Sequence, residues 1–429
     1  MYDRKLKELT MDIKSIIKSF REEKCPCGRV HETSVKDVRI GSGLVNDVGA
    51  ILAENGFPKK ILLVADKDTL AAANGIIESL SEFDIEYKIY DRIRVARMEH
   101  VNELCEMIRD RDIALLGVGT GSVHDPCRLA AARENKKLCL FGTAPSMDGF
   151  ASYSSPIVDG YFKASYAAKS PEVIIGDTAI LAKAPTQLKS SGFGDMVAKY
   201  VGLIDWQIST LLTGEYYCEK IASLTRLGID TLMGMADRVT VEDEETAGKI
   251  FEALLMTGLG MSFAQNSRPA SGCEHVVAHL IECFELLEDK EPNFHGEDVG
   301  VATLEMLKLY SEMAKHEKIH GRRETVDWND VYATFGPMAD DVRKLNEPKT
   351  VADEVDPAFL EENWQKVRDI IASVPSYEEC REKMKLAGCK LTVADIGKPQ
   401  ALFDKCVKYS PYMRYRMTLL RIRDMIELL

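Results

Sequence analysis

Three histidines lie close together in the second half of the chain, in the segments SGCEHVVAHLIECFE and NFHGEDVG. His275 and His279 are four residues apart, so on a helix their side chains share one face, and His295 begins the next predicted helix. The chain has only eight histidines, which makes this grouping informative. A lone histidine is more often a core or surface residue than a ligand, and spacing alone leaves both interpretations open.

Asp195, in the segment SSGFGDMVAKY, adds an oxygen donor, and Gly192 and Gly194 leave room around its carboxylate. Carboxylate and imidazole ligands suit a borderline divalent ion such as zinc, nickel or iron. A site with three protein ligands keeps positions open for a substrate, as catalytic metal sites require. These residues are candidates for a catalytic metal site, but their spacing matches no known short metal-binding motif, and ordinary core or surface roles explain them equally well.

Two loops rich in glycine and polar residues follow successive predicted strands. The first, GVGTGS at 117–122, lies between the apolar run IALL and the helical SVHDPCRLAAAR. Its glycines would let the backbone approach a diphosphate, and the helix N-terminus would supply free N–H groups. The second, TAPSMDG at 143–149, follows LCLF, and ligands of parallel sheets bind at this end of the strands. Each loop alone could be a plain turn, with Asp148 as a cap, but two at successive strand ends favour a binding site.

Asp66 ends another predicted strand, in the segment LLVADKDT. A carboxylate at this position can accept hydrogen bonds from the ribose of a dinucleotide and disfavour a 2′-phosphate. The neighbouring Lys67 makes that preference ambiguous. Capping of the following helix explains Asp66 equally well.

The segment CPCGRVH places Cys25, Cys27 and His31 within seven residues. They could ligate a second, structural zinc, but they supply only three ligands, and Cys-x-Cys is tighter than the usual Cys-x-x-Cys. We favour a simple turn between an N-terminal helix and the first strand over a zinc site, and either of these over a redox role.

Alternating strands and helices must position the two loops. From about residue 34 the apolar runs VRIG, KILLVAD, IEYKIYD, IALLGVG and KLCLFGTA alternate with helical stretches, which predicts βαβ units and a parallel sheet. The segment 155–166 predicts a hairpin, EVIIGD predicts a last strand, and nearly everything after about residue 180 has helical periodicity. We therefore expect an α/β nucleotide-binding domain at 1–180, beginning with a charged amphipathic helix at about 2–23, and an all-helical domain at 181–429.

The composition is that of an acidic globular protein, with 45% hydrophobic residues and a net charge of −13. An acidic chain is a poor nucleic-acid binder, because phosphate contacts need clustered lysine and arginine. No uncharged apolar run approaches the roughly 18 residues of a membrane helix, and the N-terminus lacks the apolar core of a signal peptide. The 11 cysteines, an odd number, are consistent with reduced thiols in the cytoplasm.

Taken in chain order, these segments resemble a known family. The segments GVGTGSVHD, TAPSMDGFAS, GFGDMVAKYVGLIDW, SFAQNSRPASGCEHVVAHLIE and HGEDVGVAT are similar to those of sn-glycerol-1-phosphate dehydrogenase, in particular its AraM-like bacterial branch. That family belongs to the dehydroquinate synthase and iron-containing alcohol dehydrogenase superfamily, so the resemblance implies a dehydroquinate synthase-like fold. It extends from about residue 35 to about 310, and the helical tail to 429 fits the longer bacterial form.

The resemblance also implies roles for individual residues. One divalent metal, zinc or nickel or alternatively iron, would be bound by Asp195, His275 and His295. Asp148 and His279 would contact the substrate and serve as catalytic residues, and Asp195 would touch the substrate as well as the metal. The cofactor, NAD or NADP, would be bound by Asp66, Gly119, Thr120, Gly121, Ser122, Val123, Thr143, Ala144, Pro145, Ser146 and Ser152. Thr120 and His124 depart from the family pattern, which weakens the inferred diphosphate contact and leaves His124 without a role.

The implied reaction is the reversible reduction of dihydroxyacetone phosphate to sn-glycerol 1-phosphate by NADH or NADPH, by a homodimer. The metal would act as a Lewis acid on the ketone oxygen, and Asp148 or His279 would relay the proton. Lys163 and Arg268 are candidates for binding the substrate phosphate. Equally good explanations are that Lys163 is a solvated charge on the hairpin and that Arg268 forms a surface salt bridge. The alternatives are a glycerol or polyol dehydrogenase, a lyase of the same superfamily, and a catalytically silent binding protein. Whether the product enters phospholipid biosynthesis is left open.

Overall fold

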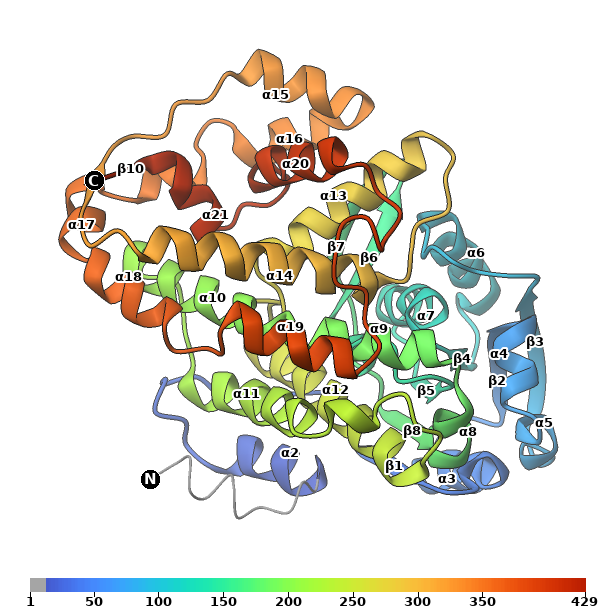
Figure 1. The fold of residues 1–429 in the computed structure, drawn as a ribbon. Coiled ribbons are helices and arrows are strands. Elements are labelled where there is room, and N and C mark those ends of the chain that lie inside the picture. Colours follow the sequence, from blue (N-terminus) through green and yellow to red (C-terminus); the bar gives the residue numbers. More distant parts are fainter. Residues whose placement is uncertain (1–12) are drawn as a thin grey trace.

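The first part of the chain is built on a six-stranded parallel sheet, seen in a computed structural model that describes residues 13–429 (Figure 1). The strands lie in the order β1-β8-β5-β4-β2-β3, and every neighbouring pair is parallel. Their bounds are β1 Asp37–Gly41, β2 Lys60–Asp66, β3 Asp84–Tyr90, β4 Ala114–Gly119, β5 Leu138–Gly142 and β8 Val173–Asp177. Each strand coincides with one of the apolar runs, so the predicted parallel sheet is confirmed.

Helices cover both faces of this sheet, as the alternation of strand side chains requires. They are α3 Val48–Glu54, α4 Lys67–Ala72, α5 Ile76–Ser79, α6 Met98–Ile108 and α7 Gly121–Arg133. On β2, Leu62 and Val64 belong to the core cluster that contains α6 and α7, whereas Ile61 and Leu63 belong to the cluster that contains α3 and α5. Because the strands are buried on both faces, they appear in the sequence as continuous apolar runs.

A two-stranded antiparallel hairpin follows the sheet strand β5. It consists of β6 (Ser154–Asp159) and β7 (Phe162–Ala167), and its tight turn contains Gly160 with a left-handed φ of 59°. The predicted hairpin is therefore confirmed. It reaches the helical region, where Arg414 donates to the backbone oxygen of Lys163 at 2.6 Å.

Beyond β8 the chain is helical, as predicted, apart from one small sheet. The helices are α8 Thr178–Lys183, α9 Thr186–Val197, α10 Lys199–Thr213, α11 Glu219–Met233, α12 Glu244–Ala264, α13 Cys273–Leu287, α14 His295–Ala314, α15 Trp328–Phe335, α16 Ala339–Asn346, α17 Pro357–Glu362, α18 Trp364–Ile371, α19 Tyr377–Leu386, α20 Gln400–Tyr409 and α21 Leu419–Ile422. The exception is the antiparallel pair β9 (Ile319–Gly321) and β10 (Ile426–Leu428), which is too short to show a strand periodicity in the sequence. Within residues 13–429, no helix is both long and apolar enough to cross a membrane.

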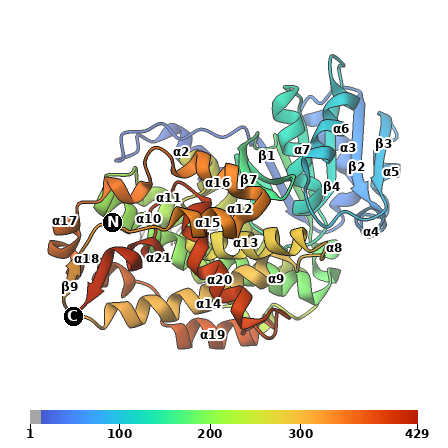
Figure 2. The same ribbon diagram turned by 90° about the horizontal axis from the view of Figure 1, so that it is seen from above.

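The N-terminal helix α2 (Ile13–Glu22) packs on the helical region rather than on the sheet. Its apolar residues share a core cluster with α12, and the ring of Phe20 stacks on that of Phe263 with centroids 4.2 Å apart. Figure 2 shows α2 beside the helices, in the half of the molecule away from β3. The predicted helix at 2–23 is confirmed from residue 13 onward, and its first part lies outside the described residues. The division at residue 180 stays a prediction.

Candidate functional site

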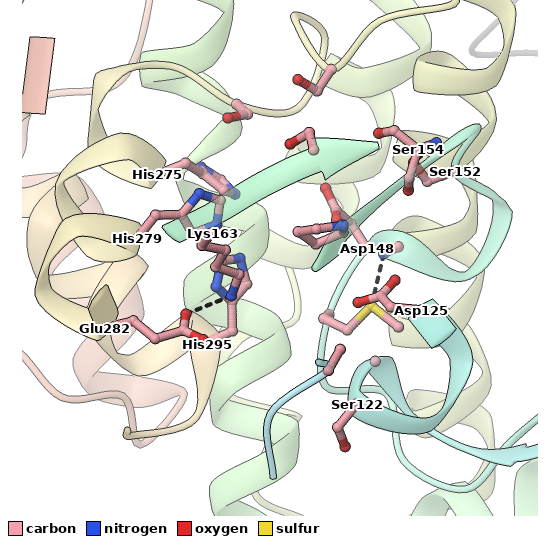
Figure 3. Close-up of a pocket in the computed structure, with 18 of the residues that line it drawn as sticks. Ser122, Asp125, Asp148, Ser152, Ser154, Lys163, His275, His279, Glu282 and His295 are labelled. Atoms are coloured by element: carbon pink, nitrogen blue, oxygen red, sulfur yellow. Dashed lines mark hydrogen bonds and ion pairs between the residues drawn. The ribbon is translucent and has the colours of Figure 1, made fainter. Parts of the chain in front are cut away.

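A cavity opens between the sheet and the helical region (Figure 3), and its space, including the part open to solvent, is about 1000 Å³. The N-terminus of α7, the loop after β5, the hairpin, α13 and α14 form its walls. Its lining includes Ser122, Asp125, Asp148, Ser152, Lys163, His275, His279, Glu282 and His295. The glycine-containing loops and the histidines, which lie far apart in the sequence, thus face one space.

Asp195, His275 and His295 converge from three different helices, α9, α13 and α14. One ligand atom from each lies within 4.8 Å of the others. Nε2 of His275 is 3.3 Å from Oδ1 of Asp195, and the His275 and His295 rings have centroids 5.3 Å apart. A carboxylate and two imidazoles at such separations fit the ligand set of a borderline divalent cation.

Glycines allow the two helices that carry Asp195 and His295 to touch backbone to backbone. A Cβ on Gly296 would stand 1.9 Å from the carbonyl oxygen of Ser191 on α9, and a Cβ on Gly194 would stand 2.5 Å from that of Gly296. Ser191 also accepts, through Oγ, a hydrogen bond from the N–H of Gly296 at 3.1 Å. The glycines around Asp195 therefore provide close helix packing as well as the room that the sequence indicated.

Glu274 fixes the orientation of the His275 ring. Nδ1 of His275 lies 2.5 Å from Oε1 of Glu274, which also accepts the N–H of Gly272 at 2.9 Å. A metal-binding histidine normally donates its second ring N–H in this way, which aims the other nitrogen at the ion. Burial alone would lower the pKa of His275, but its hydrogen bonds with Asp195 and Glu274 outweigh burial and raise it. Sequence inspection missed Glu274, although it is adjacent to the histidine.

His279 lies one turn beyond His275 and faces the cavity. Its ring stacks on that of His295, with centroids 5.4 Å apart and an angle of 28° between the planes. Burial holds the pKa of both His279 and His295 well below the usual value for histidine. Both rings are therefore neutral at physiological pH, which is the form that offers a nitrogen lone pair.

Lys199 is a charged residue of the site that sequence inspection missed. It is fully buried, and its Nζ lies 2.5 Å from Oδ1 of Asp195 and 2.8 Å from Oδ2 of Asp148. The backbone N–H of Asp148 also donates to Oδ2 of Asp195 at 3.0 Å. Burial alone would raise the pKa of Asp195, but Lys199 and the histidines hold it far below its usual range. Lys199 follows Asp195 by four residues, a spacing that could have revealed the pair.

The two loops predicted to bind the cofactor lie side by side at the ends of β4 and β5. The strands align Gly119 with Gly142, and the N–H of Thr143 donates to the oxygen of Gly119 at 3.0 Å. Gly121 and Ser122, in the first turn of α7, line the cavity. The remaining predicted loop residues do not line the cavity: Gly119, Thr120, Val123, Thr143, Ala144, Pro145 and Ser146. The arrangement offers backbone N–H groups at a helix N-terminus, as a diphosphate requires.

Asp66 caps helix α4, the alternative that the sequence left open. Its Oδ1 accepts the N–H of Thr69 at 2.8 Å, and its Oδ2 accepts that of Ile93 at 3.4 Å. Asp66 ends β2, which is the neighbour of β4 in the sheet. A contact between Asp66 and the ribose stays a prediction. Ser152 lines the cavity, and its Oγ donates to the oxygen of Ser154 at 3.0 Å.

Asp125 and Arg128 form a buried ion pair in the cavity wall that the sequence did not single out. Arg128 is fully buried and also donates to the backbone oxygens of Gly149 and Ser152. It thereby holds the segment after Asp148 against α7.

Of the two candidates for phosphate binding, the structure brings only Lys163 to the cavity. Nζ of Lys163 lines the space and pairs with Glu282 of α13 at 2.5 Å. Arg268 is buried away from it, where it pairs with Glu215 and donates to Ser209 at 3.0 Å and to the oxygen of Met417 at 2.8 Å. The prediction for Arg268 is therefore wrong, because internal partners already use its guanidinium. Ser267 and Ser271, from the same loop, line the cavity instead.

The sequence is similar to a protein-family model and to curated proteins. The family model "Iron-containing alcohol dehydrogenase" matches residues 39–185. A glycerol-1-phosphate dehydrogenase [NAD(P)+] of Halalkalibacterium halodurans is 27% identical over 92% of this chain and 94% of its own length. The protein of the same name from Thermococcus kodakarensis is 32% identical over 70% of this chain and 83% of its own length.

Solved structures support the same fold. A probable glycerol dehydrogenase from Sinorhizobium meliloti matches with a TM-score of 0.55 and 18% identity, over 88% of this chain and 97% of that one. The NADH-dependent butanol dehydrogenase A from Thermotoga maritima matches with a TM-score of 0.59 and 17% identity, over 92% of both chains. At such low identity these matches bear on the fold alone, and they confirm the predicted fold class.

Proposed function

The chain belongs to the glycerol-1-phosphate dehydrogenase family, and we propose that its cavity reduces dihydroxyacetone phosphate reversibly to sn-glycerol 1-phosphate with NADH or NADPH. It is thus a metal-dependent oxidoreductase that acts on a CH–OH group. The observation that supports this use of the cavity most directly is the convergence of Asp195, His275 and His295 beside Asp148 and the N-terminus of α7.

Asp195, His275 and His295 are proposed as the ligands of one divalent metal, zinc, nickel or iron. Their neighbours suit that task, since Glu274 orients His275 and Lys199 holds Asp195 ionised. When bound, the metal supplies a Lewis acid for the carbonyl oxygen and the dinucleotide carries the hydride. Asp195 is also proposed to touch the substrate, a role supported by its contact with Asp148, which lines the cavity.

Asp148 and His279 are proposed as the residues that contact the reacting end of the substrate and exchange its proton. Both line the cavity, and they approach it from opposite sides (Figure 3). Lys199 holds the carboxylate of Asp148, and the N–H of Asp148 is bound by Asp195, so a positioned carboxylate oxygen would accept a hydrogen bond from a substrate hydroxyl. The ring of His279 is held by its stacking on His295.

The dinucleotide is proposed to lie across the ends of β4 and β5, with its diphosphate at the first turn of α7. Gly119–Val123 and Thr143–Ser146 would contact it with main-chain groups, and Ser152 would reach it from the cavity wall. Asp66 would contact the ribose through the carboxylate lone pairs that are not used in capping α4.

Lys163 is proposed to bind the substrate phosphate, which predicts a selective effect of Lys163→Met. A charge-assisted hydrogen bond contributes about 1.5–3 kcal/mol, so kcat/KM for dihydroxyacetone phosphate should fall about 10–100-fold. The value for dihydroxyacetone, which has no phosphate, should stay nearly constant. Steady-state kinetics with both substrates measures the difference.

Two further variants isolate the phosphate effect. Glu282 would be left unpaired by Lys163→Met and could repel the phosphate, so the double variant Lys163→Met/Glu282→Gln should show the same selectivity. Lys60→Met removes a half-exposed lysine at the first residue of β2, which does not line the cavity. It should leave kcat/KM unchanged for both substrates. Equal losses for both substrates would refute the assignment of Lys163.

The proposed reaction is tested by NADH and NADPH oxidation with dihydroxyacetone phosphate in the presence of zinc, nickel or iron. We expect a metal-dependent rate and sn-glycerol 1-phosphate as the product in a chiral analysis. Equal specificity constants for dihydroxyacetone and its phosphate would instead favour the alternative, a glycerol or polyol dehydrogenase. The sn-3 enantiomer as product would contradict the proposal.

The assembly and the cellular location are further proposals. We propose a homodimer, supported by the family resemblance, and light scattering would measure its mass. We propose the cytoplasm, supported by 11 cysteines of which none forms a disulfide in residues 13–429. Labelling of free thiols in intact cells would check the reduced state.

A further inference from the structure

Four potential metal ligands meet at a second place, far in sequence from the cavity residues. Cys25, Cys27 and His31 lie in the loop that follows α2, and Cys218 immediately precedes α11. Each contributes one ligand atom, and all four atoms lie within 4.8 Å of one another. Sequence inspection found only the first three, which is why a simple turn was the favoured interpretation.

The distances within this Cys25–Cys27–His31–Cys218 cluster match a tetrahedral ion site. Zinc binds sulfur at about 2.3 Å and imidazole nitrogen at about 2.0–2.1 Å, which puts tetrahedral ligands roughly 3.5–3.8 Å apart. The observed separations are 3.6 Å between Cys25 and Cys218, 3.3 Å between Cys27 and Nε2 of His31, and 3.6 Å between Cys218 and Nε2 of His31. A disulfide would instead bring two sulfurs to about 2.05 Å.

We propose that Cys25, Cys27, His31 and Cys218 bind a structural zinc ion. Three thiolates and one imidazole complete a tetrahedral shell, which leaves no open position for a substrate, so the site is structural rather than catalytic. None of the four residues lines the cavity between the sheet and the helical region. The ion would therefore be additional to the one proposed at Asp195, His275 and His295.

The surroundings of the cluster prepare its atoms for an ion. Nδ1 of His31 lies 3.1 Å from the backbone oxygen of Phe263, a contact that aims Nε2 at the sulfurs, as in most histidine metal sites. Cys218 is the N-cap residue of α11, so its sulfur lies at the end of the helix where the dipole favours negative charge. Cys25, His31 and Cys218 are almost completely buried, so the ion would be shielded from solvent.

The ion would join the N-terminal segment to the helical region. It would connect the loop after α2 to the start of α11, and His31 would extend that connection to the end of α12 through Phe263. The segment that follows α12 carries Ser267 and Ser271, which line the cavity. Loss of the ion should therefore release α2 and loosen this wall of the cavity.

Cobalt substitution distinguishes this site from the catalytic one. Co²⁺ bound to thiolates absorbs in the near ultraviolet by charge transfer from sulfur, whereas the Asp195–His275–His295 set contains no sulfur. Full-length protein loaded with Co²⁺ under anaerobic conditions should show this absorption, and it should be lost in Cys27→Ser and Cys218→Ser. Cys389→Ser is the matched control, because Cys389 is half-buried like Cys27 but lies outside the cluster. This variant should keep the absorption.

His31→Cys keeps the test decisive if a serine variant fails to fold. It offers four thiolates, so we expect a folded protein with stronger sulfur-to-cobalt absorption, whereas His31→Ala should lose cobalt from this site. As purified, wild-type protein should hold one more equivalent of zinc than Cys27→Ser.

Two results would overturn the proposal. One is the absence of sulfur-to-cobalt absorption in the folded, cobalt-loaded wild type. The other is a thiol count, after denaturation with a chelator and no reductant, that is two below the 11 cysteines, because it would indicate a Cys25–Cys218 disulfide.

Discussion

His275→Ala is expected to reduce kcat by about 10³-fold or more and to remove one equivalent of metal. A Lewis acid stabilises the developing oxyanion by several kcal/mol, and each 1.36 kcal/mol corresponds to a tenfold change in rate. His275 is also the ligand that Glu274 orients, so its loss removes both a donor and its fixed direction. Steady-state kinetics and elemental analysis of the purified variant measure both effects.

Two other histidine variants serve as comparisons. His279→Ala should lower the rate but retain all the metal, because His279 faces the cavity without being one of the proposed ligands. His320→Ala replaces an exposed histidine that does not line the cavity and should behave as wild type. A His275→Ala protein with full metal content and full rate would refute the ligand assignment.

Gly296→Ala should destabilise the fold by about 3 kcal/mol and lower the rate about 100-fold, although the residue contacts no substrate. The new Cβ would stand 1.9 Å from the backbone oxygen of Ser191, and neither backbone can move without separating α9 from α14. That separation would move His295 away from Asp195. Chemical denaturation, metal affinity and kinetics report the three consequences.

Gly234→Ala is the matched control for this substitution. Gly234 ends helix α11 with an ordinary φ of −69°, and a Cβ there would approach no atom closer than 3.4 Å. It should leave stability and activity close to those of wild type. Unchanged metal affinity in Gly296→Ala would show that contact between the helices does not position the ligands.

The sheet and the hairpin could be predicted because their information is local. Strands buried on both faces appear as unbroken apolar runs, and the Asp-Gly pair at 159–160 marks the hairpin turn. The three-residue strands β9 and β10 carry no such signal, since they pair the segment after α14 with the end of the chain.

Residues of the site could be predicted only where a sequence motif or a short spacing marked them. Closeness in the sequence groups His275, His279 and His295, but only the family resemblance assigned the metal to Asp195, His275 and His295 and the substrate to His279. Cys218 could not be assigned to Cys25, Cys27 and His31, because 187 residues separate it from His31 and only the tertiary fold brings them together. The prediction that Arg268 binds the phosphate was wrong for a related reason. Its partner Glu215 lies 53 residues away, so the sequence did not show that the guanidinium is already paired.

Lys199 has a consequence for the packing of the two carboxylates beside it. Two buried carboxylates, Asp148 and Asp195, would repel each other if no cation stood between them, and Lys199 is that cation. The positive charge that these carboxylates need is therefore part of the chain itself, so the contact between α9 and the loop after β5 does not depend on a cation taken from solution.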